Sequence, residues 1–137
     1  QALIQAINMG ADEALMLDPH GFVASCNSTN FFIVKDGVVK TSTGRFNFCG
    51  ITRANVLAIC REHGIAAQER PFSLTEVYGA DEAFVTGTFA GVVPVRSIDG
   101  RAISAGRGPM VQRLQGLYRD WLARDIAARK TLAGALP

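Results

Sequence analysis

Two short segments combine glycine with hydroxyl residues in a way that suits anion binding. Gly50-Ile51-Thr52 opens a helical pattern that ends with Gly64 in the position after the C-cap. Backbone N–H groups at a helix N-terminus lack partners inside the helix, and the helix dipole is positive there, so a phosphate dianion is stabilised at that end. Thr86-Gly87-Thr88 follows an apolar strand pattern, and a glycine turn with flanking hydroxyls can form a concave nest of N–H groups. Each segment also has a plainer interpretation, a threonine N-cap for the first and a β-turn for the second.

A third segment, Ala24 to Asn30 ("ASCNSTN"), consists almost entirely of small residues between two apolar strand patterns. Small side chains let a flat ligand lie close to the backbone. The same residues could instead form a polar loop whose hydroxyl and amide groups hydrogen-bond locally. Taken alone, this segment leaves both interpretations open.

The composition excludes several classes of protein. A chain of 137 residues with 48% hydrophobic and 19% charged residues is typical of one globular domain. A net charge of +2 without a basic run argues against a nucleic-acid partner, and the sequence predicts neither a membrane span nor a signal peptide. Three irregularly spaced cysteines indicate reduced thiols and a cytoplasmic protein, with no CxxC pair to begin a metal site.

The pattern of elements predicts an α+β domain with hairpins and helices alternating. Lys35–Gly37 and Asp99-Gly100 are hairpin signals. The predicted strands lie at 13–18 (a buried one), 22–25, 30–34, 38–43, 65–70, 82–88 and 91–98, where Pro94 indicates an edge strand.

The helix boundaries carry clear local signals. An apolar stripe in residues 2–7 predicts an opening helix that Gly10 stops, and the missing cap suggests that the chain starts in mid-fold. Gly64 followed by Ile65 predicts a Schellman stop. Ser73 and Glu76 predict a capping box, with Phe72 and Val77 as the hydrophobic staple. The last helix is expected to start near Gly108-Pro109 and to carry one apolar face, made of Val111, Leu114, Leu117, Tyr118, Trp121, Leu122 and Ile126.

Together, the three segments resemble the cofactor-binding half of class IV aminotransferases, the fold-type IV pyridoxal-phosphate enzymes. The resemblance covers nearly the whole chain. Its most specific parts are "GITR" at Gly50–Arg53 and "TGTFAGVVPV" at Thr86–Val95, with the capping-box segment between them. It implies an α+β fold with a mixed sheet or pseudo-barrel and flanking helices. It also implies that residues 1–137 form a single C-terminal domain that binds pyridoxal 5′-phosphate.

The resemblance assigns roles by position. Ile51 and Thr52 would hold the cofactor phosphate after Gly50, and Gly87 with Thr88 would complete that cup. Thr88, Phe89 and Ala90 would bind the substrate carboxylate. Phe48 would pack on the pyridine ring, Ser28 would lie near it, and Asn30 would be structural. Arg53 is expected to point to solvent and is left out of the site.

Two departures from the family pattern matter. The only lysines are Lys35, Lys40 and Lys130, and none stands where the family has its Schiff-base lysine, just before the first helix. We therefore expect no catalytic residue in this chain, and we expect that residue and the N-terminal domain to belong to a longer parent. Ser25 stands where most of the family has a glutamate that keeps the ring nitrogen protonated. The implied electron sink is weaker, unless Asn27 supplies the contact.

The sequence thus predicts an aminotransferase that moves an amino group between an amino acid and a 2-oxo acid, and a fragment that is inactive alone. The branched-chain enzymes are among the expected relatives, and a homodimer is the expected assembly. A lyase of the same fold and a non-catalytic anion-binding or dimerisation module remain as alternatives. The amino donor and the stereochemistry stay undetermined.

Overall fold

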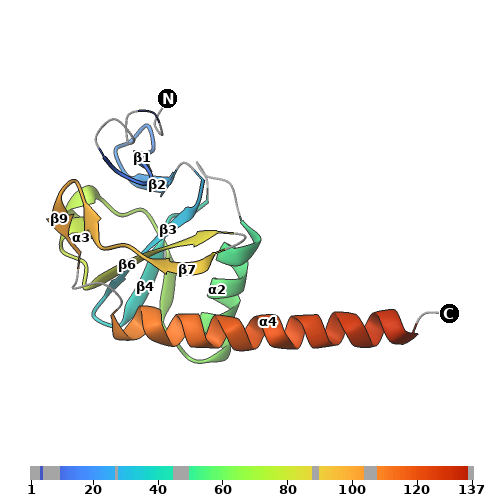
Figure 1. Cartoon of the computed structure of the whole chain (residues 1–137). Helices are drawn as coiled ribbons and strands as arrows, with labels where there is room; N and C mark the ends of the chain where they lie inside the picture. Colours follow the sequence, from blue (N-terminus) through green and yellow to red (C-terminus); the bar gives the residue numbers. More distant parts are fainter. Residues whose placement is uncertain are drawn as a thin grey trace.

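The computed structural model describes residues 4, 10–26, 28–44, 50–87, 90–103 and 108–135, which form the predicted α+β fold. A five-stranded sheet has the strand order β5-β4-β3-β6-β7 and is mixed, because β4 and β5 run parallel while the other neighbours are antiparallel. The elements in chain order are β1 (Leu15–Leu17), β2 (Val23–Cys26), β3 (Asn30–Lys35), β4 (Val38–Thr41), α2 (Ile51–Glu62), β5 (Ala67–Glu69), α3 (Leu74–Tyr78), β6 (Glu82–Gly87), β7 (Gly91–Pro94), β8 (Ser97–Ile98), β9 (Arg101–Ala102) and α4 (Pro109–Ala135). Figure 1 shows the sheet between α2 and α4 on one side and the β1–β2 pair and α3 on the other.

Local signals fixed most of the turns and helix ends. Asp36 and Gly37 both have positive φ, at 51° and 76°, so they form the tight turn that joins β3 to β4. At the end of α2 the N–H of Ile65 donates to Cys60 O at 2.9 Å and Gly64 takes a φ of 67°, which confirms the Schellman stop.

The capping box at α3 is also confirmed. The Ser73 hydroxyl accepts from the Glu76 N–H, and the Glu76 carboxylate accepts from the Ser73 N–H at 2.9 Å. The staple residues Phe72 and Val77 are both fully buried in one cluster. This short helix therefore has a fixed entry angle onto the sheet.

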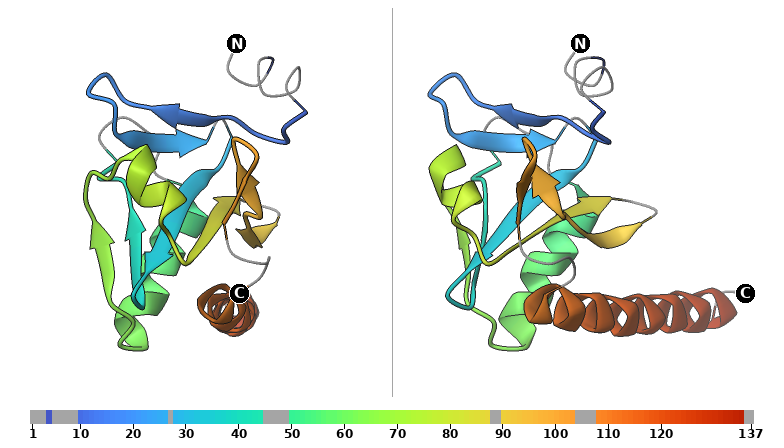
Figure 2. Two further views of the ribbon diagram at one scale, coloured as in Figure 1. Left: turned by 90° about the vertical axis from the view of Figure 1, so that its left-hand side faces the viewer. Right: turned by 60° about the vertical axis from the view of Figure 1, so that its left-hand side comes forward.

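Each face of the sheet packs against a separate apolar cluster. On one face, Phe32 and Phe84 stack with ring centroids 4.7 Å apart beneath α2 and the first half of α4. On the other face, Phe31 and Val85 pack against β2, α3 and Ile103. Figure 2 shows the β1–β2 pair lying across this second face, away from α4. Alternation along β3 and β6 thus gives the sheet two apolar sides.

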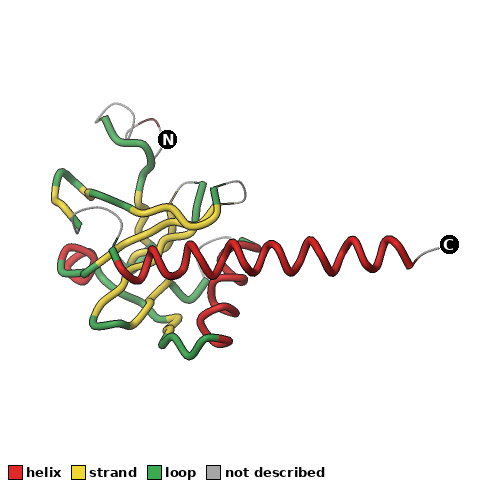
Figure 3. Tube along the Cα trace, turned by 60° about the horizontal axis from the view of Figure 1, so that its bottom comes forward, coloured by secondary structure: helices red, strands yellow, loops and turns green. Residues whose placement is uncertain are grey.

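Helix α4 starts at Pro109 as predicted, but its apolar face is only partly covered. Val111, Leu114 and Tyr118 are buried, whereas Leu122 is 38% exposed and Ile126 is 51% exposed. The second half of α4 extends past the sheet in Figures 1 and 3, so nothing within the described residues covers it. The predicted apolar face is thus present on α4, but helical periodicity does not specify how far the partner surface extends along it.

Two strand predictions have different outcomes. Pro94 ends β7, which is an edge strand of the sheet as its proline indicated. The strand predicted as buried is present as β1, but it is only half-covered, and Leu17 is exposed. It pairs with β2 alone, outside the main sheet. The predicted opening helix lies mainly outside the described residues.

Candidate functional site

The N-terminus of α2 has the properties of an open anion site. Gly50 is the N-cap residue in extended conformation, it has no side chain that could cap the helix, and the first turn contains no acidic residue. The interpretation of Thr52 as the N-cap was therefore wrong, because Thr52 is the second residue inside the helix. The N–H groups of Ile51 and Thr52 lie in the first turn, where a helix offers no internal acceptors. Ile51 is strongly exposed and Thr52 is buried.

The fold brings parts of all three predicted segments to this helix end. The Thr52 hydroxyl donates to Gly87 O at 3.3 Å, across 35 residues of chain. The Gly50 N–H donates to Asn30 Oδ1 at 3.3 Å, and Asn30 pairs with Thr86 across β3 and β6. The two glycine-containing segments therefore meet at one end of the sheet, beside the end of the small-residue segment. Figure 1 shows the first turn of α2 next to the ends of β6 and β7.

Gly87 also lies close to the small-residue segment. A Cβ atom placed on Gly87 would lie 3.4 Å from Thr29 Cγ2. Absence of a side chain at Gly87 leaves its backbone open between Thr29 and the first turn of α2. A phosphate-binding site formed by backbone N–H groups requires that the ligand can approach the backbone this closely.

Within the small-residue segment, the described hydroxyls have protein partners. Ser25 is buried, and its hydroxyl donates to Thr29 O at 2.6 Å. Ser28 is exposed, and its hydroxyl donates to Glu13 Oε1 at 2.8 Å. Thr29 donates to the same carboxylate at 3.0–3.1 Å. Glu13, which sequence analysis did not select, therefore fixes this loop from the segment before β1.

Burial beside this loop also raises the pKa of the Cys26 thiol. Desolvation raises the pKa of Cys26 to about 12, and the nearby Glu13 carboxylate adds to the rise. The thiol is therefore neutral at physiological pH, and it packs as a small apolar group rather than acting as a nucleophile.

Two buried polar atoms at this site have no hydrogen-bond partner within the described structure. They are Thr86 Oγ1 and Arg53 Nε. Thr86 shares a sheet face with Asn30, whose side chain accepts from Gly50, so its hydroxyl lies beneath the first turn of α2. An unsatisfied buried polar group costs about 1–3 kcal/mol, and such groups often mark a place for a bound water or ligand. The donors gathered here fit a phosphorylated cofactor.

Arg53 does not point to solvent, so that expectation was wrong. Its side chain is 6% exposed, and Nη2 donates to Ser42 O and to Glu69 Oε1, both at 2.8 Å. A sequence signal for this burial exists, because Arg53 precedes Val56, Leu57 and Cys60 at helical spacing on the buried face of α2.

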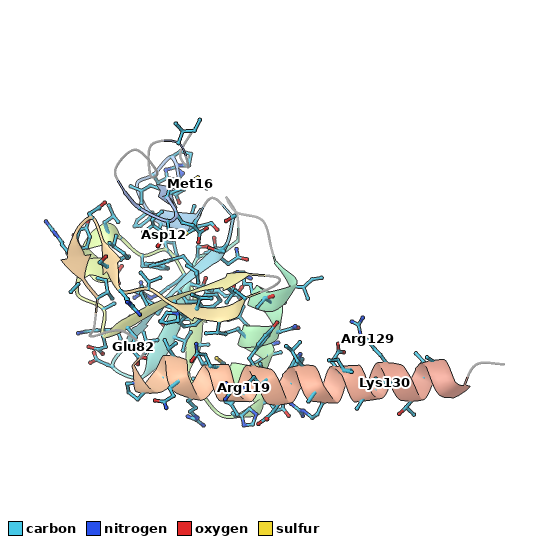
Figure 4. All side chains as sticks on the ribbon, in the orientation of Figure 1. Asp12, Met16, Glu82, Arg119, Arg129 and Lys130 are labelled. Atoms are coloured by element: carbon cyan, nitrogen blue, oxygen red, sulfur yellow. The ribbon has the colours of Figure 1, made fainter. Side chains whose placement is uncertain are left out.

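All three lysines lie away from this helix end. Lys35 is at the other end of β3 from Asn30 and pairs with Asp81 at 3.5 Å. Lys35 and Lys40 line a shallow groove of about 320 Å³ beside α3. Lys130 is on the part of α4 that extends past the sheet, as Figure 4 shows. None of the three lysine amines, all in described parts of the chain, reaches the candidate site.

The remaining predicted site residues divide into two groups. Ala90 is exposed just before β7. Asn27, Phe48, Thr88 and Phe89 lie outside the described residues, so their predicted roles stay predictions.

Comparison with known proteins decides the family. The model for amino-transferase class IV matches residues 1–98, which is more than half of the chain. The chain belongs to the class IV aminotransferase family. Its relatives include the branched-chain-amino-acid aminotransferase of Pseudomonas aeruginosa, which is 51% identical over 128 residues that cover 93% of this chain and 42% of that protein.

Solved structures agree with this class IV assignment. The branched-chain aminotransferase of Thermoproteus uzoniensis with norvaline superposes with a TM-score of 0.81 at 39% identity, over 86% of this chain and 39% of that one. An aminotransferase from Brucella abortus bound to PLP gives a TM-score of 0.82 at 33% identity, over 88% and 42% of the two chains. The chain therefore has the fold of these enzymes and spans about two fifths of their length. Among the described residues, no helix combines the length and the apolar character that crossing a membrane requires.

Proposed function

We propose that this chain is the C-terminal cofactor-binding domain of a pyridoxal-phosphate aminotransferase acting on branched-chain amino acids and 2-oxo acids. The observation that carries the proposal is the meeting of Thr52 and Gly87 at the N-terminus of α2, where the N-cap residue Gly50 has no side chain. Support also comes from the unpartnered Thr86 hydroxyl beneath that turn. The family and the named activity of its relatives supply the reaction class.

In this proposal the chain's own groups bind and orient the phosphate. The N–H groups of Ile51 and Thr52 donate to it, and the Thr52 hydroxyl turns from its long contact with Gly87 O toward the anion. Gly87 and Thr88 close the cup, and Thr88, Phe89 and Ala90 receive the substrate carboxylate. When bound, pyridoxal 5′-phosphate supplies the electron sink for amino-group transfer.

Ser25 is the residue that fits the family pattern least well. Its hydroxyl proton is committed to Thr29 O at 2.6 Å, and no carboxylate occupies its position. A neutral oxygen would stabilise a protonated ring nitrogen less than a carboxylate does. We expect Ser25→Glu to shift the absorbance of the bound cofactor toward that of a fully protonated ring. An unchanged spectrum would show that another group, such as the Asn27 amide oxygen, already stabilises the protonated ring nitrogen by accepting its hydrogen bond.

The proposal places the reacting amine outside residues 1–137, because none of the three lysines lies at the site. It also includes a cytoplasmic location, which the buried free thiols of Cys26 and Cys60 support. It includes a homodimer as well, which the exposed apolar residues Leu122 and Ile126 support.

The test uses the protein that carries this chain together with the rest of its open reading frame. We expect it to retain pyridoxal 5′-phosphate and to form 2-oxo acids faster from leucine, isoleucine and valine than from alanine or aspartate. Thr52→Val should lower cofactor affinity about tenfold, the effect of one hydrogen bond to a charged group. Thr75→Val, an exposed threonine on α3, is the matched control.

Two alternatives predict different outcomes. A lyase of this fold would retain the cofactor and cleave amino substrates without needing a 2-oxo acid acceptor. A non-catalytic binding module would bind the cofactor, yet borohydride would fix none of it to a lysine. Full affinity for the cofactor in Thr52→Val would contradict the anion site itself.

A further inference from the structure

Arg53 occupies a position in α2 where a positive charge is electrostatically unfavourable. It lies in the first turn of α2, at the positive end of the helix dipole, and a cation is destabilised there. Its guanidinium is also buried, while its one carboxylate partner, Glu69, is 48% exposed. Burying a charge costs free energy unless it is well paired, and Arg53 Nε has no hydrogen-bond partner among the described residues. A negatively charged ligand at the same helix end would offset the free-energy cost of the buried Arg53 charge.

Among the side-chain hydrogen bonds of the described residues, those of Arg53 are the shortest that hold the first turn of α2. Its bonds to Ser42 O and Glu69 are both 2.8 Å, whereas the two bonds at the cup, from Thr52 to Gly87 O and from Gly50 to Asn30, are 3.3 Å. Hydrogen bonds weaken with length, so the anchor of this turn is Arg53.

That anchor reaches a second strand. Ser42 accepts from Arg53 through its carbonyl and donates its hydroxyl to Ala24 O at 2.7 Å, and both ends of this bond are buried. Arg53 thus ties the first turn of α2 to the end of β4 and, through Ser42, to β2 next to Ser25. The angle at which the helix end faces Gly87 depends on this chain of contacts.

We propose that Arg53 is a positioning residue for the anion site. Acting through Ser42 and Glu69, it fixes the N–H groups of the first α2 turn and supplies a buried positive charge that favours a dianion. This inference rests on the proposed function, since it assigns Arg53 a part in binding the cofactor phosphate.

The test compares pyridoxamine 5′-phosphate with pyridoxamine by calorimetry on the full protein. Neither probe has an aldehyde, so surface lysines cannot capture them. Arg53→Met should weaken binding of the phosphorylated probe about tenfold and leave pyridoxamine unchanged. Arg53→Lys, which keeps the charge, should recover part of the loss. Arg61→Met, an exposed arginine in the last turn of the same helix, is the control and should change neither.

A second variant keeps the proposal testable if Arg53→Met fails to fold. Glu69→Gln retains an acceptor for Arg53 and removes the neutralising charge, so it should strengthen binding of pyridoxamine 5′-phosphate by about two- to fivefold. Two results would overturn the role of Arg53 and leave the proposed function standing. One is an unchanged affinity of Glu69→Gln for pyridoxamine 5′-phosphate, and the other is an equal loss of affinity for both probes in Arg53→Met. Equal affinity of the unaltered protein for the two probes would remove the anion site and, with it, the proposed function.

Discussion

Glu82, on strand β6, caps the N-terminus of α4, and its removal should weaken the packing of α4 on the sheet. Helix α4 begins at Pro109, which has no N–H, so its first free donors are those of Met110 and Val111. These donate to the two carboxylate oxygens of Glu82 at 3.1 and 2.9 Å, and Glu82 is only 5% exposed. Figure 4 shows Glu82 at the start of α4.

The size of the effect follows from these contacts. Each hydrogen bond to a charged group contributes about 1.5–3 kcal/mol, and a carboxylate at a helix N-terminus adds about 0.3–1 kcal/mol. Glu82→Ala leaves two N–H groups unpaired and opens a void, so we expect a loss of about 4 kcal/mol in the free energy of unfolding. Glu82→Gln keeps the volume and one acceptor, so its loss should be about 1–2 kcal/mol.

Gly108 provides an independent check on the same geometry. A Cβ atom at Gly108 would lie 2.4 Å from Cδ and Oε1 of Glu82, and the carboxylate cannot yield without losing its hydrogen bonds. Gly108→Ala should therefore cost about 2 kcal/mol in the unaltered protein and under about 0.5 kcal/mol when Glu82 is alanine.

Urea denaturation followed by far-UV circular dichroism measures the free energy of unfolding of the unaltered protein, Glu82→Ala, Gly108→Ala and the double variant, which together form a double-mutant cycle. Asp120→Ala, which removes an exposed carboxylate from the same helix, serves as the control and should stay within about 0.5 kcal/mol. The reasoning fails if Glu82→Ala costs less than about 1 kcal/mol, or if Gly108→Ala costs the same in both backgrounds.

Three further outcomes are expected. Gly91→Ala should destabilise the fold by about 2–4 kcal/mol in urea denaturation, because Gly91 has a φ of 66° and its Cβ would lie 2.8 Å from Tyr118 Cε1; a neutral result would contradict the close approach. Burial raises the pKa of Cys26 from 9.0 to about 12, so the unfolded state loses its proton first and stability should fall between those pH values, with a shallower fall in Cys26→Ala. The hydrogen bond from the Ser73 N–H lowers the pKa of Glu76, so its contribution is present above pH 4.5 and lost as the pH falls below that value; Glu76→Gln should flatten acid-denaturation curves there.

The sequence by itself determined the features whose hydrogen bonds close within a few residues. The Asp36-Gly37 turn, the Schellman stop at Gly64 and the capping box at Ser73 are all present where they were predicted. Each depends on one or two residue types with special backbone or capping properties, so neighbouring residues specify it without help from the rest of the fold. The glycine-containing segments at Gly50 and Gly87 were recognisable as candidate anion sites for the same reason.

Only the tertiary structure decided which distant groups meet. Thr52 and Gly87 are 35 positions apart, and the cap on α4 comes from Glu82, 29 positions before Val111. Neither the partner nor the distance is encoded near either residue, since both depend on how the sheet aligns its strand ends with the helix starts. The burial of Arg53 combines both sources: the apolar residues that follow it set its helical face, whereas the acceptors that make burial tolerable come from other segments.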